Sequence, residues 1–144
     1  MDERIKEHLM RLNRYRLQLA ELGQVPLQDF KSDNLRRAAA ERTLHLAIES
    51  CINIGNRLLS LIQLEKPVDT PETYADIFVQ LRALEIVGPE FADRLVKMAK
   101  FRNRLVHLYW EVDVDTLYRI LQENLSDLMA FQDIIINYFR EKEK

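Results

Sequence analysis

Apolar residues recur at steps of three and four along nearly the whole chain, the spacing that places side chains on one face of an α-helix. Glycine and proline, the residues that most often interrupt helices, occupy only 3 and 4 positions. The periodic stretches and the breaks between them predict five helices, over about residues 3–22, 33–64, 71–87, 89 to at least 98, and 114–141.

The expected helix ends carry suitable residues. Gly23 follows the first helix, and Thr70 is expected to cap the third, with a proline in its first turn. The second helix would extend some 45 Å at about 1.5 Å per residue, so we expect it to bend near Gly55 or to lie along a partner. The expected fold is all-α, an antiparallel bundle of about five helices in a single domain over residues 1–144, present as a homodimer.

Composition narrows the class of protein. The 144 residues carry 21 Lys and Arg against 23 Asp and Glu, a formal charge of −2, and 47% of them are hydrophobic. This excludes a disordered chain, and the single cysteine, Cys51, excludes a disulfide scaffold and is expected to be buried. The mixed-charge N-terminus and the lack of an apolar run of about 18 residues predict a cytoplasmic protein without membrane contact.

The sequence contains no common pattern for binding a metal or a cofactor. HExxH, CxxC, the P-loop, GxGxxG and G-x-S-x-G are missing, and one cysteine cannot build a sulfur zinc site. Asp113 and Asp115 alternate like metal ligands, but at the start of a helix they are better explained as caps. We therefore expect neither a cofactor nor a metal.

One segment departs from the even distribution of charge. Between Asp93 and Glu111, cationic residues and one histidine occur without a carboxylate: Arg94, Lys97, Lys100, Arg102, Arg104 and His107. Such a cluster can bind a ligand that carries phosphate. On charge alone, a solvated basic helix face is the more common explanation.

Arg102 does not fit a solvated face. The apolar stripe of Leu95 and Met98 continues at the same steps to Arg102, so the guanidinium faces the core if the helix extends that far. A buried guanidinium is costly unless it is paired. Arg102 therefore forms either an ion pair with an acid such as Glu49 or Glu41, or a phosphate clamp, for which its fork of donors is suited.

On a straight helix, His107 and Arg102 would point in different directions and could not act on the same phosphate. Five residues separate them, a rotation of about 140°, whereas Asn103 and His107 point together. Either the helix breaks near here, or two chains each supply part of one site. A neutral imidazole beside guanidinium groups suits metal-free RNA cleavage, because the imidazole takes the 2′-hydroxyl proton and the cations stabilise the charged transition state. His8 and His45 are expected to be structural.

The segment from Arg102 to Tyr109 has the form R-x4-H-x-Y. It resembles the signature of the HepT-like branch of the HEPN superfamily, which consists of small all-helical proteins. The sequences of residues 41–56 and 109–113 support the resemblance, which extends from about Arg36 to Tyr138.

The resemblance implies roles for individual residues. Arg102 and His107 would be the ribonuclease pair, at a cleft between two protomers, and Asn103 matches the polar residue that usually follows the arginine. Tyr109 matches the tyrosine that a cognate MNT-type nucleotidyltransferase antitoxin adenylylates to silence the toxin. Three further cations are candidates for binding RNA phosphate: Arg104, Lys100 and Lys97.

The expected function is that of a toxin-type, metal-independent endoribonuclease, paired with a nucleotidyltransferase antitoxin and acting on tRNA or mRNA. The alternative is a non-catalytic helical module that docks a nucleotidyltransferase through the same cationic cleft. A purely structural helical dimer would leave the position of Arg102 unexplained.

Overall fold

The computed structural model describes residues 1–107 and 112–144, and within them the chain forms seven helices. They are α1 (Glu3–Leu22), α2 (Leu27–Ser32), α3 (Asn34–Gln63), α4 (Tyr74–Ala83), α5 (Pro89–Val106), α6 (Val114–Glu123) and α7 (Leu125–Lys142). The prediction of an all-α fold is confirmed.

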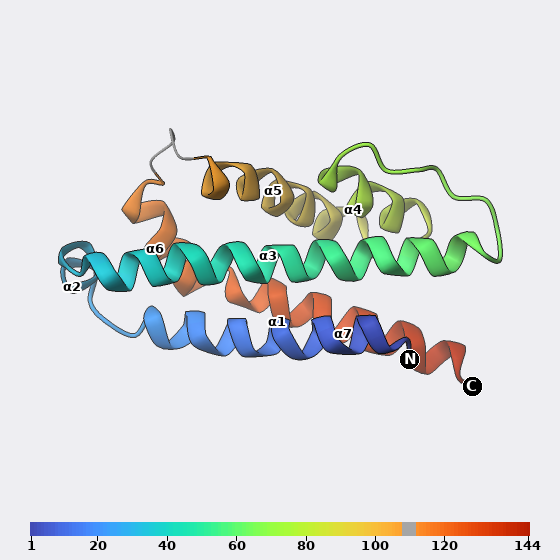
Figure 1. Ribbon diagram of the computed structural model, residues 1–144, viewed down its shortest axis with the longest axis horizontal. Coiled ribbons are helices and arrows are strands. Elements are labelled where there is room, and N and C mark those ends of the chain that lie inside the picture. The colour runs from blue at the N-terminus through green and yellow to red at the C-terminus, as the bar shows by residue number, and fades with distance from the viewer. Residues whose placement is uncertain (108–111) are drawn as a thin grey trace.

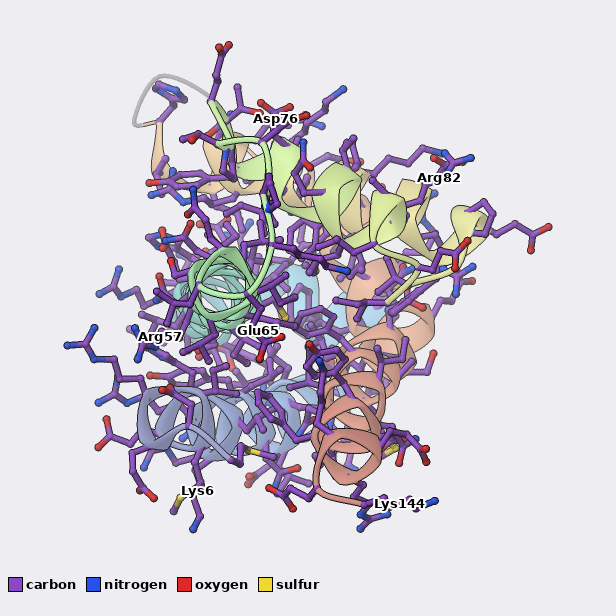
Figure 2. The ribbon with its side chains drawn as sticks, turned by 90° about the vertical axis from the view of Figure 1, so that its right-hand side faces the viewer. Lys6, Arg57, Glu65, Asp76, Arg82 and Lys144 are labelled. Atoms are coloured by element: carbon purple, nitrogen blue, oxygen red, sulfur yellow. The ribbon has the colours of Figure 1, made fainter. Side chains whose placement is uncertain are left out.

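The 30-residue helix α3 runs through the centre of the molecule. In Figure 1, α1 and α7 lie on one side of α3 and α4 and α5 on the other, while α2 and α6 lie near the start of α3. Both α1 and α5 run antiparallel to α3. Figure 2, a view nearly along α3, shows the same order, with α1 and α4 on opposite sides of α3 and α7 beside it. The long central helix α3 thus lies against α5, which carries most of the residues predicted to form the site.

The first two predicted helices agree with the structure, and a short helix between them was missed. α1 has the predicted bounds, and α3 begins after Asp33, whose carboxylate accepts a hydrogen bond from the Arg36 N–H at 3.0 Å. The six residues of α2 were expected to be a connection, because a segment this short cannot display a helical period. α2 buries Phe30, whose ring contacts Tyr118 of α6 with 5.4 Å between centroids.

The predicted start of the third helix was wrong. The cap is Thr73 rather than Thr70, and α4 begins at Tyr74. Thr73 and Asp76 form a reciprocal capping box, in which the Thr73 hydroxyl accepts from the Asp76 N–H at 3.2 Å and the Asp76 carboxylate accepts from the Thr73 N–H at 3.1 Å. This arrangement satisfies two backbone donors, whereas Thr70 has no acidic residue three positions later.

The predicted fifth helix is two helices, α6 and α7, and this prediction was also wrong. They meet at Asn124, which ends α6 and precedes α7. Asn124 stands in an otherwise apolar stripe, and asparagine favours helix ends because its side chain competes with the backbone for hydrogen bonds. Asp113 caps α6 as expected, and its carboxylate accepts from the Thr116 N–H at 3.3 Å.

Gly55 brings α4 close to α3. The sequence suggested a bend of the long helix near Gly55, but α3 continues through this position as one helix. A Cβ atom on Gly55 would lie 2.6 Å from Cγ2 of Ile77, far inside normal contact. The glycine therefore lets α4 approach α3, and it fixes where Tyr74, the first residue of α4, lies relative to α5.

The core is apolar, as the pattern predicts. Its largest fully buried side chains include Phe78 and Phe131, whose rings pack edge to face with 5.9 Å between centroids. Cys51 is buried as expected, and burial raises the pKa of its thiol. No helix of the described residues is long and apolar enough to cross a membrane.

Candidate active site at the end of α5

Arg102 lies where α3, α4 and α5 meet. Its Nε donates to the Glu49 carboxylate of α3 at 2.5 Å, and its guanidinium carbon lies 4.7 Å from the centre of the Tyr74 ring of α4. Its side chain is 19% exposed. Of the two acids expected from the sequence as partners, Glu49 is the one observed. Arg102 is thus held by a charge on one side and an aromatic face on another, and it still reaches solvent.

Glu49 also connects Arg102 to a histidine. Nε2 of His45 lies 3.1 Å from the same Glu49 oxygen, and its Nδ1 lies 3.3 Å from Arg42. The expectation of a structural role for His45 agrees with these contacts. His45 and Glu49 are four residues apart on one helix face, so this pair could have been predicted from the sequence.

His107 is the C-cap of α5. Its N–H still donates to the Asn103 carbonyl at 3.2 Å, with φ −82° and ψ 119°, so the backbone leaves the helix only after its Cα. At about 100° per residue, ideal helix geometry places the Cβ of His107 about 140° around α5 from that of Arg102 and about 40° from that of Asn103. The helix therefore does end here, and His107 and Arg102 leave α5 from different sides.

Tyr109 lies outside the described residues, so its predicted role stays a prediction. The segment that contains it joins two helix ends, with His107 on one side and the α6 cap Asp113 on the other. A hydrogen bond from Thr116 holds the pKa of the Asp113 carboxyl below its usual range, which keeps this cap charged.

The remaining predicted residues are exposed but do not share one surface. Lys100 and Asn103 line a cleft of about 620 Å³ between α3, α5 and the start of α4. Lys97 lines a different cleft, of about 420 Å³, between α5 and the helices α6 and α7. Arg104 lies over the Phe101 ring, 5.7 Å from its centre. Lys100 and Asn103 thus line one cleft, and Lys97, one helical turn before Lys100, lines the other.

Other residues of the first cleft were not predicted from the sequence to have a function. They include Asn53 and Asn56 of α3 and Tyr74 of α4. The two asparagines are three residues apart, which places them on one helix face. This spacing is the feature of the sequence from which their proximity could have been predicted. Nothing in the sequence indicated that Tyr74 would join them, because its position depends on the contact between α3 and α4.

Comparison with known proteins identifies the family. A family model described as Ribonuclease HepT-like matches residues 5–135. The chain is 29% identical over 106 residues to the mRNA nuclease HepT of Shewanella oneidensis, an alignment that covers 74% of this chain and 77% of that protein. It is 28% identical over 134 residues to the tRNA nuclease HepT of Aphanizomenon flos-aquae, covering 93% of this chain and 88% of that one.

The fold agrees with this assignment. The chain superposes on the tri-AMPylated HEPN toxin of Shewanella oneidensis, solved in complex with an MNT antitoxin, with a TM-score of 0.85 and 26% identity. The match covers 95% of this chain and 99% of that toxin. The resemblance found in the R-x4-H-x-Y segment is therefore confirmed, and the chain belongs to the family of HepT-like ribonucleases.

Proposed function

We propose that this protein is a metal-independent endoribonuclease of the toxin type, in which Arg102 and His107 cleave tRNA or mRNA. The observation that carries the proposal is the fixed position of Arg102 at the solvent-exposed end of a cationic helix. Two relatives are named as nucleases of mRNA and tRNA, which supports RNA as the substrate.

The chemistry follows from the two side chains. The His107 imidazole accepts the proton of the 2′-hydroxyl, whose oxygen then attacks the adjacent phosphorus. The bond from phosphorus to the 5′-oxygen breaks, this oxygen takes a proton from water, and the imidazolium returns its proton to solvent, so the products are a 2′,3′-cyclic phosphate and a 5′-hydroxyl. Arg102 stabilises the negative charge that develops on the phosphate oxygens, and Asn103, on the same side of α5 as His107, contributes a polar contact.

Glu49 and Tyr74 act as positioning residues for Arg102. The hydrogen bond to Glu49 uses Nε, so the two terminal nitrogens of the guanidinium form the edge that faces a phosphate. Tyr74 covers one face of the guanidinium. An arginine restrained in this way loses less freedom when it binds the transition state than a mobile surface arginine does.

We infer further that the active site is shared between two protomers of a homodimer, since His107 and Arg102 of one chain point to different sides of α5. A two-fold axis lets Arg102 of one chain face the His107 of its partner.

Arg102→Ala and His107→Ala chains, co-expressed with different tags, would then form mixed dimers that contain one intact site. Random assortment should restore about a quarter of wild-type activity. No recovery in purified mixed dimers would refute a shared site.

Adenylylation of Tyr109 by an MNT-type nucleotidyltransferase antitoxin would silence the enzyme. Tyr109 is two residues from His107, so an adenylate there adds bulk and negative charge where the substrate phosphate must bind. The toxin of known structure that was solved with an MNT antitoxin is AMPylated, which supports this regulation. Co-expression should raise the intact mass by one or more adenylates in wild type, and Tyr109→Phe should lack the mass increase. An unmodified Tyr109 beside an active antitoxin would contradict it.

The second candidate is a non-catalytic module that docks a nucleotidyltransferase through the same surface. The net charge of −2 favours it, because the chain as a whole does not attract RNA. Growth of cells that lack the partner distinguishes the two. An endoribonuclease should arrest growth when induced, His107→Ala should abolish the arrest, and His8→Ala, the same change on α1, should not. A docking module would leave growth unchanged in all three cases.

A further inference from the structure

The cleft of about 620 Å³ beside Arg102 has the size of a ligand site. Its walls come from α3, α5 and the start of α4, and its floor includes the buried residues Ile52, Ile77 and Ala99. An apolar floor with polar groups at the rim is suited to a flat molecule that has hydrogen-bonding edges.

The polar rim is rich in amides. Asn53 and Asn56 of α3 and Asn103 of α5 are exposed and line the cleft. Each amide offers two N–H donors and a carbonyl acceptor, the combination that pairs with the donor and acceptor atoms on the edge of a nucleobase. Lys100, also on the rim, supplies a positive charge for the phosphate attached to such a base.

Tyr74 connects this cleft to the catalytic arginine. Its ring lines the cleft, is 45% exposed, and has the Arg102 guanidinium 4.7 Å from its centre. The ring is partly exposed to solvent, and aromatic rings exposed in this way stack with unpaired bases. A base stacked on Tyr74 would place its phosphate near Arg102.

We infer that this cleft binds one unpaired nucleobase of the RNA next to the phosphate that is cleaved, with Asn53, Asn56 and Asn103 contacting its edge, Tyr74 stacking on its face and Lys100 pairing with its phosphate. This inference rests on the proposed ribonuclease function. It makes the substrate single-stranded at the cut, because a paired base cannot present its Watson–Crick edge to the asparagines or its face to Tyr74.

Binding can be separated from cleavage. In the His107→Ala background, the affinity for a fluorescein-labelled single-stranded RNA hexanucleotide of mixed sequence is measured by anisotropy, beside a duplex of the same sequence. Asn56→Ala should weaken single-strand binding about three- to tenfold, since one hydrogen bond to an uncharged base is lost. Asn137→Ala, an exposed asparagine in the middle of α7, is the matched control and should not change affinity.

Tyr74 gives a second readout. Tyr74→Leu should weaken binding about tenfold, whereas Tyr74→Phe, which retains the stacking face, should bind like the parent. Equal affinity for the duplex and the single strand, or an Asn56→Ala affinity equal to that of Asn137→Ala, would overturn the inference. So would an Asn56→Ala protein whose dimer dissociates while its RNA affinity stays unchanged, because the cleft would then be a contact between copies of the chain.

The two proposals fail in different ways. Cleavage by wild type together with unchanged binding by Asn56→Ala would overturn the base-binding cleft alone. Single-strand binding that depends on Asn56 and Tyr74, in a wild-type protein that cleaves no RNA, would overturn the ribonuclease function alone.

Discussion

The contact between Arg102 and Glu49 leads to a quantitative prediction about how firmly Arg102, the proposed catalytic arginine, is held. We consider a double-mutant cycle with Arg102→Met, which keeps the apolar stem, and Glu49→Gln, which keeps the shape of the carboxylate. The two single variants and the double variant together isolate the energy of this pair from the other effects of each change.

The burial of the two side chains sets the expected magnitude. They are 19% and 26% exposed, and the hydrogen bond between them is direct. Exposed ion pairs contribute about 0.2–1 kcal/mol, and breaking fully buried ones costs about 3–5 kcal/mol. A pair that is mostly but not fully buried should lie between these limits, with a coupling energy of about 1–2 kcal/mol.

The assay is urea unfolding followed by circular dichroism, at equal protein concentration, because a dimer makes stability depend on concentration. A second cycle on Lys142 and Glu65 serves as the control. Their side chains are 53% and 69% exposed and their charged atoms lie 3.5 Å apart, so no coupling should be measurable there. A coupling for Arg102 and Glu49 no larger than this control would refute the view that α3 fixes Arg102.

Two further predictions concern parts of the fold that support the site. Asp2 caps α1 and pairs with Arg57 at 2.8 Å, and the hydrogen bond from Arg57 holds the pKa of the Asp2 carboxyl below its usual range. The stabilisation is therefore present above the ordinary pKa of about 4 and is lost as pH falls through the lower folded value, so the difference in Tm between wild type and Asp2→Asn should shrink below about pH 4. A constant difference from pH 7 to pH 3 would contradict this. Gly55→Ala gains about 1 kcal/mol in helix propensity but overpacks Ile77 by about 1–3 kcal/mol, so urea unfolding should show a net loss of about 1 kcal/mol, and a more stable variant would refute the close approach of α3 and α4.

The features that could be predicted from the sequence are those encoded within one helix. The bounds of α1, the Asp113 cap and the burial of Cys51 follow from local spacing and residue type. The pairing of Arg102 with Glu49 was one of two alternatives that its place on an apolar stripe left open. These predictions succeeded because helical periodicity determines which face is buried before any tertiary contact is known.

The features that were missed depend on contacts between helices. Asn53 and Asn56 resemble ordinary solvated positions of α3, and they become part of a cleft only because Gly55 lets α4 place Tyr74 beside them. The break at Asn124 also escaped prediction, because the apolar pattern continues across it. A one-dimensional pattern cannot specify which neighbouring helix covers a given face.

Cleavage of RNA in EDTA tests the central claim most directly. Purified protein made without any nucleotidyltransferase is incubated with total tRNA and with a long mRNA, beside His107→Ala and the control His8→Ala, and the mass of Tyr109 is read from the same tube. The proposed mechanism predicts that wild type and His8→Ala cleave the RNA and leave ends that carry a 2′,3′-cyclic phosphate. It predicts no cleavage by His107→Ala. Intact RNA after incubation with wild-type protein whose Tyr109 is unmodified would contradict it.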